Sequence, residues 1–298
     1  MVGRGPAVAF PSPVVELSDD RLRGVRLLVK RDDLLHPDLP GNKWRKLEDN
    51  LAAAREQGHS RLLTFGGAYS NHIAATAAAG WHFGFDTVGV IRGEEHLPLN
   101  PVLAAATARG MRLTYLDRTR YRSKHTPGVV SALAAEFGRC YLLPEGGSNA
   151  LAAAGCARLG RELVGQVPEV DLVCCPVGTG GTLAGLAAGV GPRRRAVGVA
   201  VLKGGGFLRD EVAALQLSAF GAVSANWTIA EEFHFGGYAR RTAPLDAFIA
   251  DFASRHGLLL DWVYVAKMLY GVYALAADGR IPAGSTVVAV ITGRCDYV

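Results

Sequence analysis

The sequence predicts a parallel α/β fold, and three observations support this prediction. Segments with the pattern of short buried strands alternate with helical segments along most of the 298 residues. Residues 172–177 form an almost wholly apolar run, which is typical of a strand buried on both faces of a parallel sheet. Glycine-rich turns follow several predicted strands and lead directly into helices. There is no internal repeat and no low-complexity linker, so two domains would be interleaved rather than arranged in series.

Apolar periodicity places the elements in chain order. Residues 1–24 contain three prolines and are expected to be irregular. An apolar strand at 25–29 runs into a polar turn at 30–33, and a helix with apolar residues at helical spacing follows from 43 to about 57. The other strands are predicted at 61–65, 87–91, 112–116, 140–143, 172–177, 196–202 and 286–291. The other helices are predicted at 72–80, 101–110, 129–137, 151–163, 183–190, 245–256 and 263–278, and the tract that follows residue 202 is expected to be rich in helix.

The composition is typical of a soluble globular enzyme, with 49% hydrophobic and 20% charged residues. The net charge is +5, but the basic residues are scattered along the chain. Their one run, Arg193 to Arg195, follows a Gly-Pro pair and is expected to be a solvated loop. No aromatic residues interleave with it, so nucleic-acid binding is not expected.

Cysteine usage and the N-terminus bear on the compartment. The five cysteines are odd in number and form no C-x-x-C pair, and Cys174 and Cys175 lie inside an apolar run. This pattern favours a reducing compartment and argues against a metal site. The N-terminus has no apolar signal core, and no stretch reaches the ~20 apolar residues that span a bilayer. A cytoplasmic protein without a membrane partner is therefore expected.

Lys43 is notable because it lies where a glycine turn becomes a helix, and the chain has only six lysines. It is the third residue of the segment Gly-Asn-Lys-Trp-Arg-Lys-Leu, which begins at Gly41. The positive end of the helix dipole favours a neutral amine here, the form that reacts with an aldehyde cofactor. On its own, however, the pattern more often marks a solvated lysine in a first helical turn.

A glycine loop directly follows the apolar strand at 172–177 and opens a helix, and it consists of Gly178, Thr179, Gly180, Gly181 and Thr182. Inward-turned glycine amides and a helix N-terminus favour an anion, and the threonine hydroxyls can donate to the same phosphate. The alternative is a tight turn without a ligand. The loop is neither a P-loop nor a dinucleotide fingerprint, so a dinucleotide is disfavoured.

The turn after the strand at 61–65 carries three polar residues at the start of a helix: Ser70, Asn71 and His72. Ser70 could bind a substrate carboxylate or shuttle a proton, and Asn71 could hydrogen-bond to a phenolic oxygen. His72 could form a polar wall or lie on the surface, and taken alone it is interpreted as structural.

Two further strands end in polar residues. The segment Pro-Glu-Gly-Gly-Ser-Asn at 144–149 is on its own a generic turn with a helix-capping residue. Thr292, the first polar residue after the final strand, could face a ligand or only cap the strand. Because the carboxyl ends of parallel strands share one edge of a sheet, all these loops are expected to converge. A reactive lysine, a phosphate cradle and several hydroxyls in one crevice describe a pyridoxal phosphate site, with no metal.

These motifs resemble those of the fold-type II pyridoxal phosphate enzymes, the tryptophan synthase β group, from about residue 30 to residue 294. The likeness is greatest to the branch that holds D-cysteine desulfhydrase and 1-aminocyclopropane-1-carboxylate (ACC) deaminase. It implies two three-layer α/β/α domains with mainly parallel sheets and the cofactor in the crevice between them. A large domain of residues 1–45 and 150–298 and a small inserted domain of residues 46–149 are expected, in a homodimer.

The resemblance also assigns roles to individual residues. Lys-Arg-Asp-Asp followed by Gly-Asn-Lys marks Lys43 as the residue that forms the Schiff base. The Ser-Asn pair at 70–71 has its asparagine near the 3′ oxygen of the cofactor, and the glycine loop at 178–182 surrounds the phosphate. Tyr238 and Tyr264 match two family tyrosines that lie near the substrate.

Departures from the pattern favour D-cysteine desulfhydrase over ACC deaminase. ACC deaminases resemble one another in Ser-Asn-Gln, whereas this chain has His72 at the third position. They also place a glutamate after the second tyrosine, near the pyridine nitrogen, where this chain has Val265. The group that can then meet that nitrogen is the neutral hydroxyl of Thr292. It makes the cofactor a weaker electron sink, which is sufficient when a β substituent leaves. Residues 239–242 also lack the family's usual Pro-Asn.

The predicted function is that of a lyase that eliminates the β substituent of a small amino acid, giving a keto acid, ammonia and, from cysteine, sulfide. Lys43 removes the α-proton, and Ser70, Tyr238 and Tyr264 position the carboxylate and the leaving group. ACC deaminase and amino-acid racemase are the enzymatic alternatives. A pyridoxal phosphate carrier or sensor without turnover is the non-enzymatic one.

Overall fold

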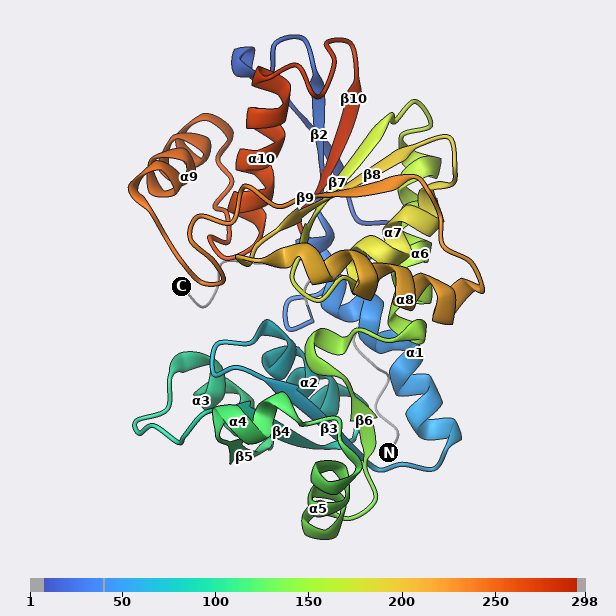
Figure 1. Ribbon diagram of the computed structural model, residues 1–298, viewed down its shortest axis with the longest axis vertical. Helices are drawn as coiled ribbons and strands as arrows, with labels where there is room; N and C mark the ends of the chain where they lie inside the picture. Colours follow the sequence, from blue (N-terminus) through green and yellow to red (C-terminus); the bar gives the residue numbers. More distant parts are fainter. Residues whose placement is uncertain (1–7, 40, 294–298) are drawn as a thin grey trace. The chain divides into compact units, whose positions relative to one another are not determined.

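The computed structural model describes residues 8–39 and 41–293, which form two compact units. The described residues of the larger unit are 8–39, 41–45 and 149–293, and the smaller unit contains residues 46–148. Each unit has its own sheet with helices on both faces (Figure 1). The predicted α/β class, with two three-layer domains and mainly parallel sheets, is confirmed.

The larger unit is built on a six-stranded sheet with the order β1-β2-β10-β7-β8-β9. Its strands are β1 (Val14–Leu17), β2 (Arg26–Lys30), β7 (Leu172–Val177), β8 (Arg195–Ala200), β9 (Trp227–Ala230) and β10 (Thr286–Val290). Only β1 runs antiparallel to its neighbour, and the other paired strands are parallel. The carboxyl ends of β2, β10, β7 and β8 therefore lie at one edge of this sheet, where the loops that follow them meet.

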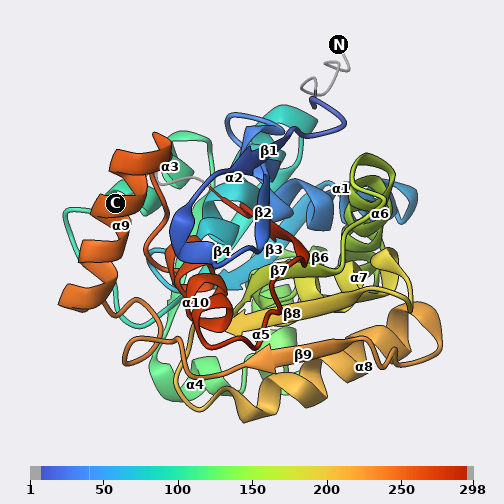
Figure 2. The same ribbon diagram turned by 90° about the horizontal axis from the view of Figure 1, so that it is seen from above.

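Helices cover both faces of this sheet. Figure 2 shows α9 (Ala243–His256) and α10 (Val265–Ala277) on one side, and α6 (Ala150–Gln166), α7 (Gly181–Val190) and α8 (Leu208–Phe220) on the other. Alternate side chains of β7 enter two different cores. Leu172 and Cys174 pack with α10, whereas Val173 and Cys175 pack with α6 and α7. Burial on both faces explains why this strand is almost wholly apolar.

The smaller unit contains a four-stranded parallel sheet with the order β5-β4-β3-β6. Its strands are β3 (Arg61–Gly66), β4 (Asp86–Arg92), β5 (Arg112–Leu116) and β6 (Tyr141–Leu143). One core lies under α2 (Asn71–Phe83) and α3 (Pro101–Ala108), and the other under α4 (Arg118–Arg122) and α5 (Pro127–Phe137). Helix α1 (Asn42–Glu56) begins in the larger unit and continues into the smaller one.

Two strands differ from the sequence prediction. Residues 14–17, expected to be irregular, form β1, and β9 lies in the tract expected to be rich in helix. Both are four-residue edge strands, and Ile229 is the one residue of the two that is buried. Such strands have no long apolar run for a pattern to detect. Four 3-10 helices complete the described chain: η1 (Asp20–Leu22), η2 (Asp32–Leu34), η3 (Glu145–Gly147) and η4 (Gly205–Phe207).

The state of the cysteines and the search for membrane-spanning helices relate to the expectations drawn from composition. Cys140, Cys156, Cys174 and Cys175 carry free thiols, and Cys295 lies outside the described residues. Within residues 8–39 and 41–293, no helix combines the length and the hydrophobicity needed to cross a membrane.

A buried polar cluster joins the N-terminal segment of the larger unit to α9 and α10. The carboxylate of Asp19 is only 1% exposed, and its Oδ2 accepts hydrogen bonds from Arg21 at 2.5 Å and from Tyr273 at 3.0 Å. His256 Nε2 lies 3.1 Å from the same oxygen. The hydrogen bond from Arg21 holds the pKa of Asp19 well below its usual range.

Acid should weaken this cluster. Because the folded pKa of Asp19 lies below the unfolded value of about 3.9, its carboxylate stabilises the fold above that pH, and this contribution is lost as the pH falls. Asp19→Asn should lower the free energy of unfolding at pH 7 by about 2 kcal/mol and flatten its dependence on pH below 5. Urea titrations at pH 2.5 and pH 7 measure this, with the exposed Asp278→Asn as control. An equal loss at both pH values would contradict the assignment.

Candidate active site

Four charged side chains meet around the turn that leads into α1, and all but the partly buried Glu162 are buried. Lys30 Nζ donates to Glu162 Oε1 at 2.5 Å, and Arg45 donates to Glu162 Oε2 and to Asp32 Oδ1, each at 2.8 Å. The two positive and two negative charges balance, which limits the cost of burying them. Burial opposes the ionisation of Glu162, but the hydrogen bonds from Arg45 and Lys30 hold its pKa below its usual value.

The same cluster holds the turn that precedes Lys43. The backbone oxygen of Asp32 accepts a hydrogen bond from Gly41 N at 2.9 Å, while its carboxylate binds Arg45. Gly41 has φ +61°, and a Cβ there would lie 1.9 Å from Thr292 O, so glycine is required. Asn42 N donates to that same oxygen at 3.2 Å. These contacts fix the start of α1, and with it Lys43, beside Thr292, which lies two residues after β10.

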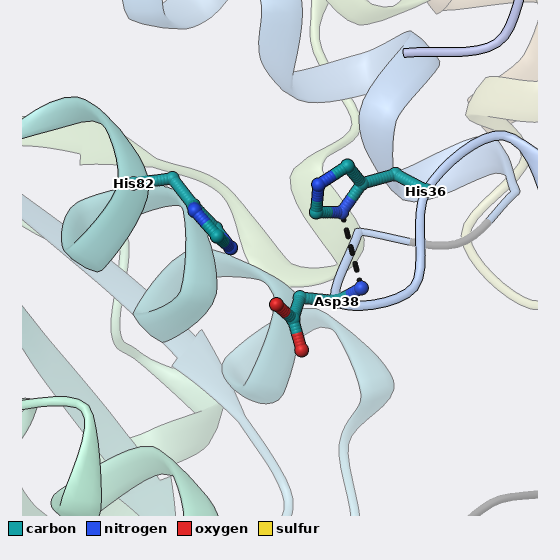
Figure 3. Close-up of side chains that lie close together, drawn as sticks. All are labelled: His36, Asp38 and His82. Atoms are coloured by element: carbon teal, nitrogen blue, oxygen red, sulfur yellow. Dashed lines mark hydrogen bonds between the residues drawn. The ribbon is translucent and has the colours of Figure 1, made fainter. Parts of the chain in front are cut away.

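His36 orders an earlier part of this turn. Its Nδ1 accepts a hydrogen bond from the backbone amide of Asp38 at 3.0 Å (Figure 3). It also accepts one from the amide of Leu39 at 3.2 Å. A neutral ring that accepts at Nδ1 carries its proton on Nε2. The ring is buried, and its contacts link residues two and three positions apart, as in a side-chain-capped turn.

The expected phosphate loop lies between β7 and α7 and contacts the segment that carries Lys43. Gly180, with φ +80°, precedes α7, so the loop leads straight into the amides of a helix N-terminus. Thr182 is buried, and its Oγ1 accepts a hydrogen bond from Asn42 Nδ2 at 2.8 Å. Asn42 therefore joins the starts of α1 and α7, which places Lys43 next to a residue that contacts the loop.

The two predicted tyrosines meet in the larger unit. Tyr264 OH donates to Tyr238 OH at 3.2 Å, and the rings meet edge to face with their centroids 5.9 Å apart. Tyr264 occupies the N-cap position of α10. A Cβ on Gly178 would lie 3.3 Å from Tyr264 Cε1, so the tyrosine pair adjoins the first residue of the glycine loop.

Ser70 and Asn71 belong to the smaller unit, at the start of α2. Ser70 is the N-cap residue, and its Oγ accepts hydrogen bonds from the amides of His72 at 3.2 Å and Ile73 at 3.4 Å. The hydroxyl proton of Ser70 is not used in these bonds. Asn71 is the first residue of the helix and is half-buried.

His72 is structural rather than part of an exposed polar wall, because its ring is only 1% exposed. Its Nε2 lies 2.9 Å from Thr64 Oγ1, and the Thr64 hydroxyl donates to Leu143 O at 3.0 Å. Since the hydroxyl proton is used in that bond, Nε2 of His72 acts as the donor to Thr64. The histidine thereby links α2 to β3 and β6.

The larger unit thus brings together Lys43, the glycine loop, Thr292 and the tyrosine pair. Sequence reasoning missed the contacts of Asn42, although it lies within the Gly-Asn-Lys motif. It also missed Asp261, whose carboxylate accepts the amides at the start of α10, and Lys267, a buried lysine in that helix. The scarcity of lysine was the one available signal for Lys267.

Comparison with known proteins identifies the family. A family model described as "Pyridoxal-phosphate dependent enzyme" matches residues 7–293. The chain belongs to this family. Its cofactor is therefore pyridoxal phosphate, as predicted. The relatives described next also confirm the predicted branch, which holds D-cysteine desulfhydrase and ACC deaminase.

Relatives of this pyridoxal-phosphate dependent enzyme carry two names. It is 32% identical to a putative ACC deaminase of Pyrococcus abyssi over 281 residues, which are 91% of this chain and 84% of that protein. It is 28% identical to a D-cysteine desulfhydrase of Klebsiella pneumoniae, over 96% of this chain and 92% of that protein. A crystal structure described as an ACC deaminase homologue has a TM-score of 0.86 at 28% identity, covering 98% of this chain and 91% of that one.

The chemistry of the larger unit fits this cofactor. Lys43 supplies a primary amine, and the glycine loop supplies amides at the N-terminus of α7, where a phosphate is favoured. Thr292, only 6% exposed, places a hydroxyl-bearing residue against the turn that holds Lys43. We propose that these groups hold the aldehyde, the phosphate and the ring nitrogen of the enzyme's cofactor, with Asn71 near its phenolic oxygen.

The buried charge cluster should be essential to the stability of this arrangement. Arg45→Met leaves the carboxylates of Asp32 and Glu162 without their main partner, so the free energy of unfolding should fall by about 3 to 5 kcal/mol. Urea denaturation measures the change. Arg26→Met is the matched control, because Arg26 also contacts two carboxylates but is exposed, and it should have little effect. Equal effects of the two substitutions would contradict the role of the cluster.

Proposed function

We propose that this enzyme eliminates the β substituent of a small amino acid, in the manner of a D-cysteine desulfhydrase, and releases a keto acid, ammonia and sulfide. The observation that carries the proposal is the neutral chemistry at the end of β10. Thr292 lies there against the turn that holds Lys43. The residue after Tyr264 is Val265, which is fully buried in the apolar core and offers no carboxylate.

Carboxylates that adjoin this part of the larger unit are engaged elsewhere. Asp32 and Asp33 are held by arginine side chains. Asp261 accepts hydrogen bonds from three amides at the start of α10. The Thr292 hydroxyl is thus the group best suited to meet the ring nitrogen. A neutral partner supports departure of a β leaving group, whereas opening a cyclopropane without an α-hydrogen calls for a stronger electron sink.

Bound pyridoxal phosphate supplies an electron sink for the carbanion that forms when the α-proton leaves. Lys43 would hold the cofactor, and its Nζ would then take the α-proton of the substrate. Ser70, with its unused hydroxyl proton, and the Tyr238–Tyr264 pair would orient the substrate carboxylate and the leaving group. Orientation of this kind lowers the barrier by fixing the reacting groups before the chemical step.

ACC deamination is the second candidate. Relatives from three Pyrococcus species, at 30% to 32% identity, are named putative ACC deaminases. A relative from Arabidopsis thaliana, at 29% identity, has a name that includes both activities. The two candidates share Lys43 and the cofactor and differ in the bond that breaks, which is the bond to a β substituent in one and a carbon–carbon bond of the cyclopropane in the other.

A substrate panel separates these candidates. Purified enzyme should release keto acid and sulfide from D-cysteine, and keto acid from β-chloroalanine, with little product from L-cysteine, serine or ACC. Lys43→Ala is the blank and should lose both the visible absorbance of the bound cofactor and all keto-acid release. The exposed Lys203→Ala should keep both. Faster ammonia release from ACC than from D-cysteine would favour the second candidate, and an unchanged absorbance in Lys43→Ala would contradict the role of Lys43.

Removing the hydroxyl of Thr292 should affect turnover. Thr292→Val keeps the shape of the side chain but loses its hydrogen bond, so kcat should fall about tenfold, equivalent to roughly 1.4 kcal/mol. Thr292→Ser restores the hydroxyl and should restore most of the rate. Steady-state keto-acid release with the preferred substrate measures both variants. Equal rates for Thr292→Val and the unmodified enzyme would remove Thr292 from the reaction.

A further inference from the structure

Lys267 is a completely buried lysine in the otherwise apolar helix α10. Its Nζ donates hydrogen bonds to three backbone carbonyls: Gly237 at 2.8 Å, His234 at 2.9 Å and Val201 at 3.4 Å. An ammonium has three N–H donors, so these bonds use all of them. Burial lowers the pKa of Lys267 to about 8, and the nearby Asp261 opposes this. The side chain is therefore mainly charged at neutral pH.

Two of these carbonyls belong to residues 234–240, here called the tyrosine loop because it carries Tyr238. Its backbone has positive φ at Phe235 (52°), Gly236 (89°), Gly237 (131°) and Ala239 (51°). Two of these residues are not glycine, and each such conformation costs about 1 to 2 kcal/mol. A loop of this kind persists only where surrounding contacts hold it. Lys267 supplies such contacts from outside the loop.

The tyrosine loop and α10 each provide one member of the tyrosine pair. Tyr238 directly follows Gly237, whose carbonyl binds Lys267. Tyr264 is the N-cap residue of α10, three residues before Lys267, and the carboxylate of Asp261 accepts its amide at 2.9 Å. The third carbonyl, that of Val201, directly follows β8 and so connects the contact to the sheet. One ammonium thus ties together the two segments whose hydroxyls meet at 3.2 Å.

We propose that Lys267 is a positioning residue of the active site, whose ammonium holds the tyrosine loop so that the Tyr238 hydroxyl stays beside Tyr264. Lys267 is buried and acts on the substrate only through Tyr238. This inference rests on the proposed role of the tyrosine pair in substrate binding. Without the ammonium, the carbonyl of Val201 would lose this donor, those of His234 and Gly237 would keep only the backbone amides inside the loop, and the positive-φ loop would relax.

The first experiment is a double-mutant cycle. Lys267→Met removes the donors at similar side-chain length, and Tyr238→Phe removes the hydroxyl. Each should retain the visible absorbance of the cofactor and lower kcat/KM for the preferred substrate between about tenfold and a hundredfold. The double variant should be no slower than the slower single variant, because both act through one hydroxyl. Multiplicative losses would overturn the proposal.

Tyr273→Phe is the matched control. It removes a buried hydroxyl on the same helix that contacts Asp19 and His256 rather than the tyrosine loop. Its kcat/KM should stay within about twofold of the unmodified enzyme. A loss equal to that of Lys267→Met would show that general loosening of α10 explains the effect, and would overturn the proposal.

The second experiment needs no turnover, so it separates this inference from the proposed reaction. Hydrogen–deuterium exchange reports the amides of Gly237 and Arg240, which are bonded inside the tyrosine loop. Lys267→Met should raise exchange in residues 234–240 at least tenfold, whereas Tyr273→Phe should not. If Lys267→Met does not fold, Lys267→Gln keeps two donors and should give an intermediate increase. Unchanged exchange in the folded variant would overturn the proposal even if no substrate is found.

Discussion

Lys30 at the end of β2 and Arg45 near the start of α1 share the carboxylate of Glu162 from α6, and Asp32 completes the group. Charges with this little exposure need partners in good geometry, so the cluster holds these three elements to one another. That arrangement closes the turn at Gly41 against Thr292 O. The position of Lys43 in the larger unit follows from it, and so does the contact of Asn42 with the glycine loop.

The parallel sheet of the larger unit supplies the second constraint. Loops after β2, β7 and β10 meet at one edge, which brings an amine, a helix N-terminus and a hydroxyl together from distant parts of the sequence. The tyrosine pair is added from α10 and the tyrosine loop, held by Lys267. Strands and a charge cluster therefore hold the side of the site proposed to bind the cofactor, while a loop of positive-φ residues holds the side proposed to meet the substrate.

The sequence patterns predicted those features that depend on residues close together in the chain. The alternation of strands and helices and the glycine loop follow from burial and from turn chemistry within a few residues. Edge strands β1 and β9 were not predictable in this way, because they lie largely outside the core. The buried partners of Lys267 lie 30 to 66 residues away, and those of Arg45 lie up to 117 residues away. No local pattern reports such contacts, and the family resemblance, rather than periodicity, indicated the tyrosines.

Trapping the cofactor on the protein tests the central claim most directly. Reduction of the holoenzyme with borohydride fixes the carbon–nitrogen bond between cofactor and lysine, and peptide mass mapping then identifies the modified residue. Because the chain has only six lysines, each can be assigned separately. The structure predicts a single modified peptide carrying the label on Lys43. A label on Lys46, Lys203 or Lys267, or no label on a protein that retains its visible absorbance, would contradict the account.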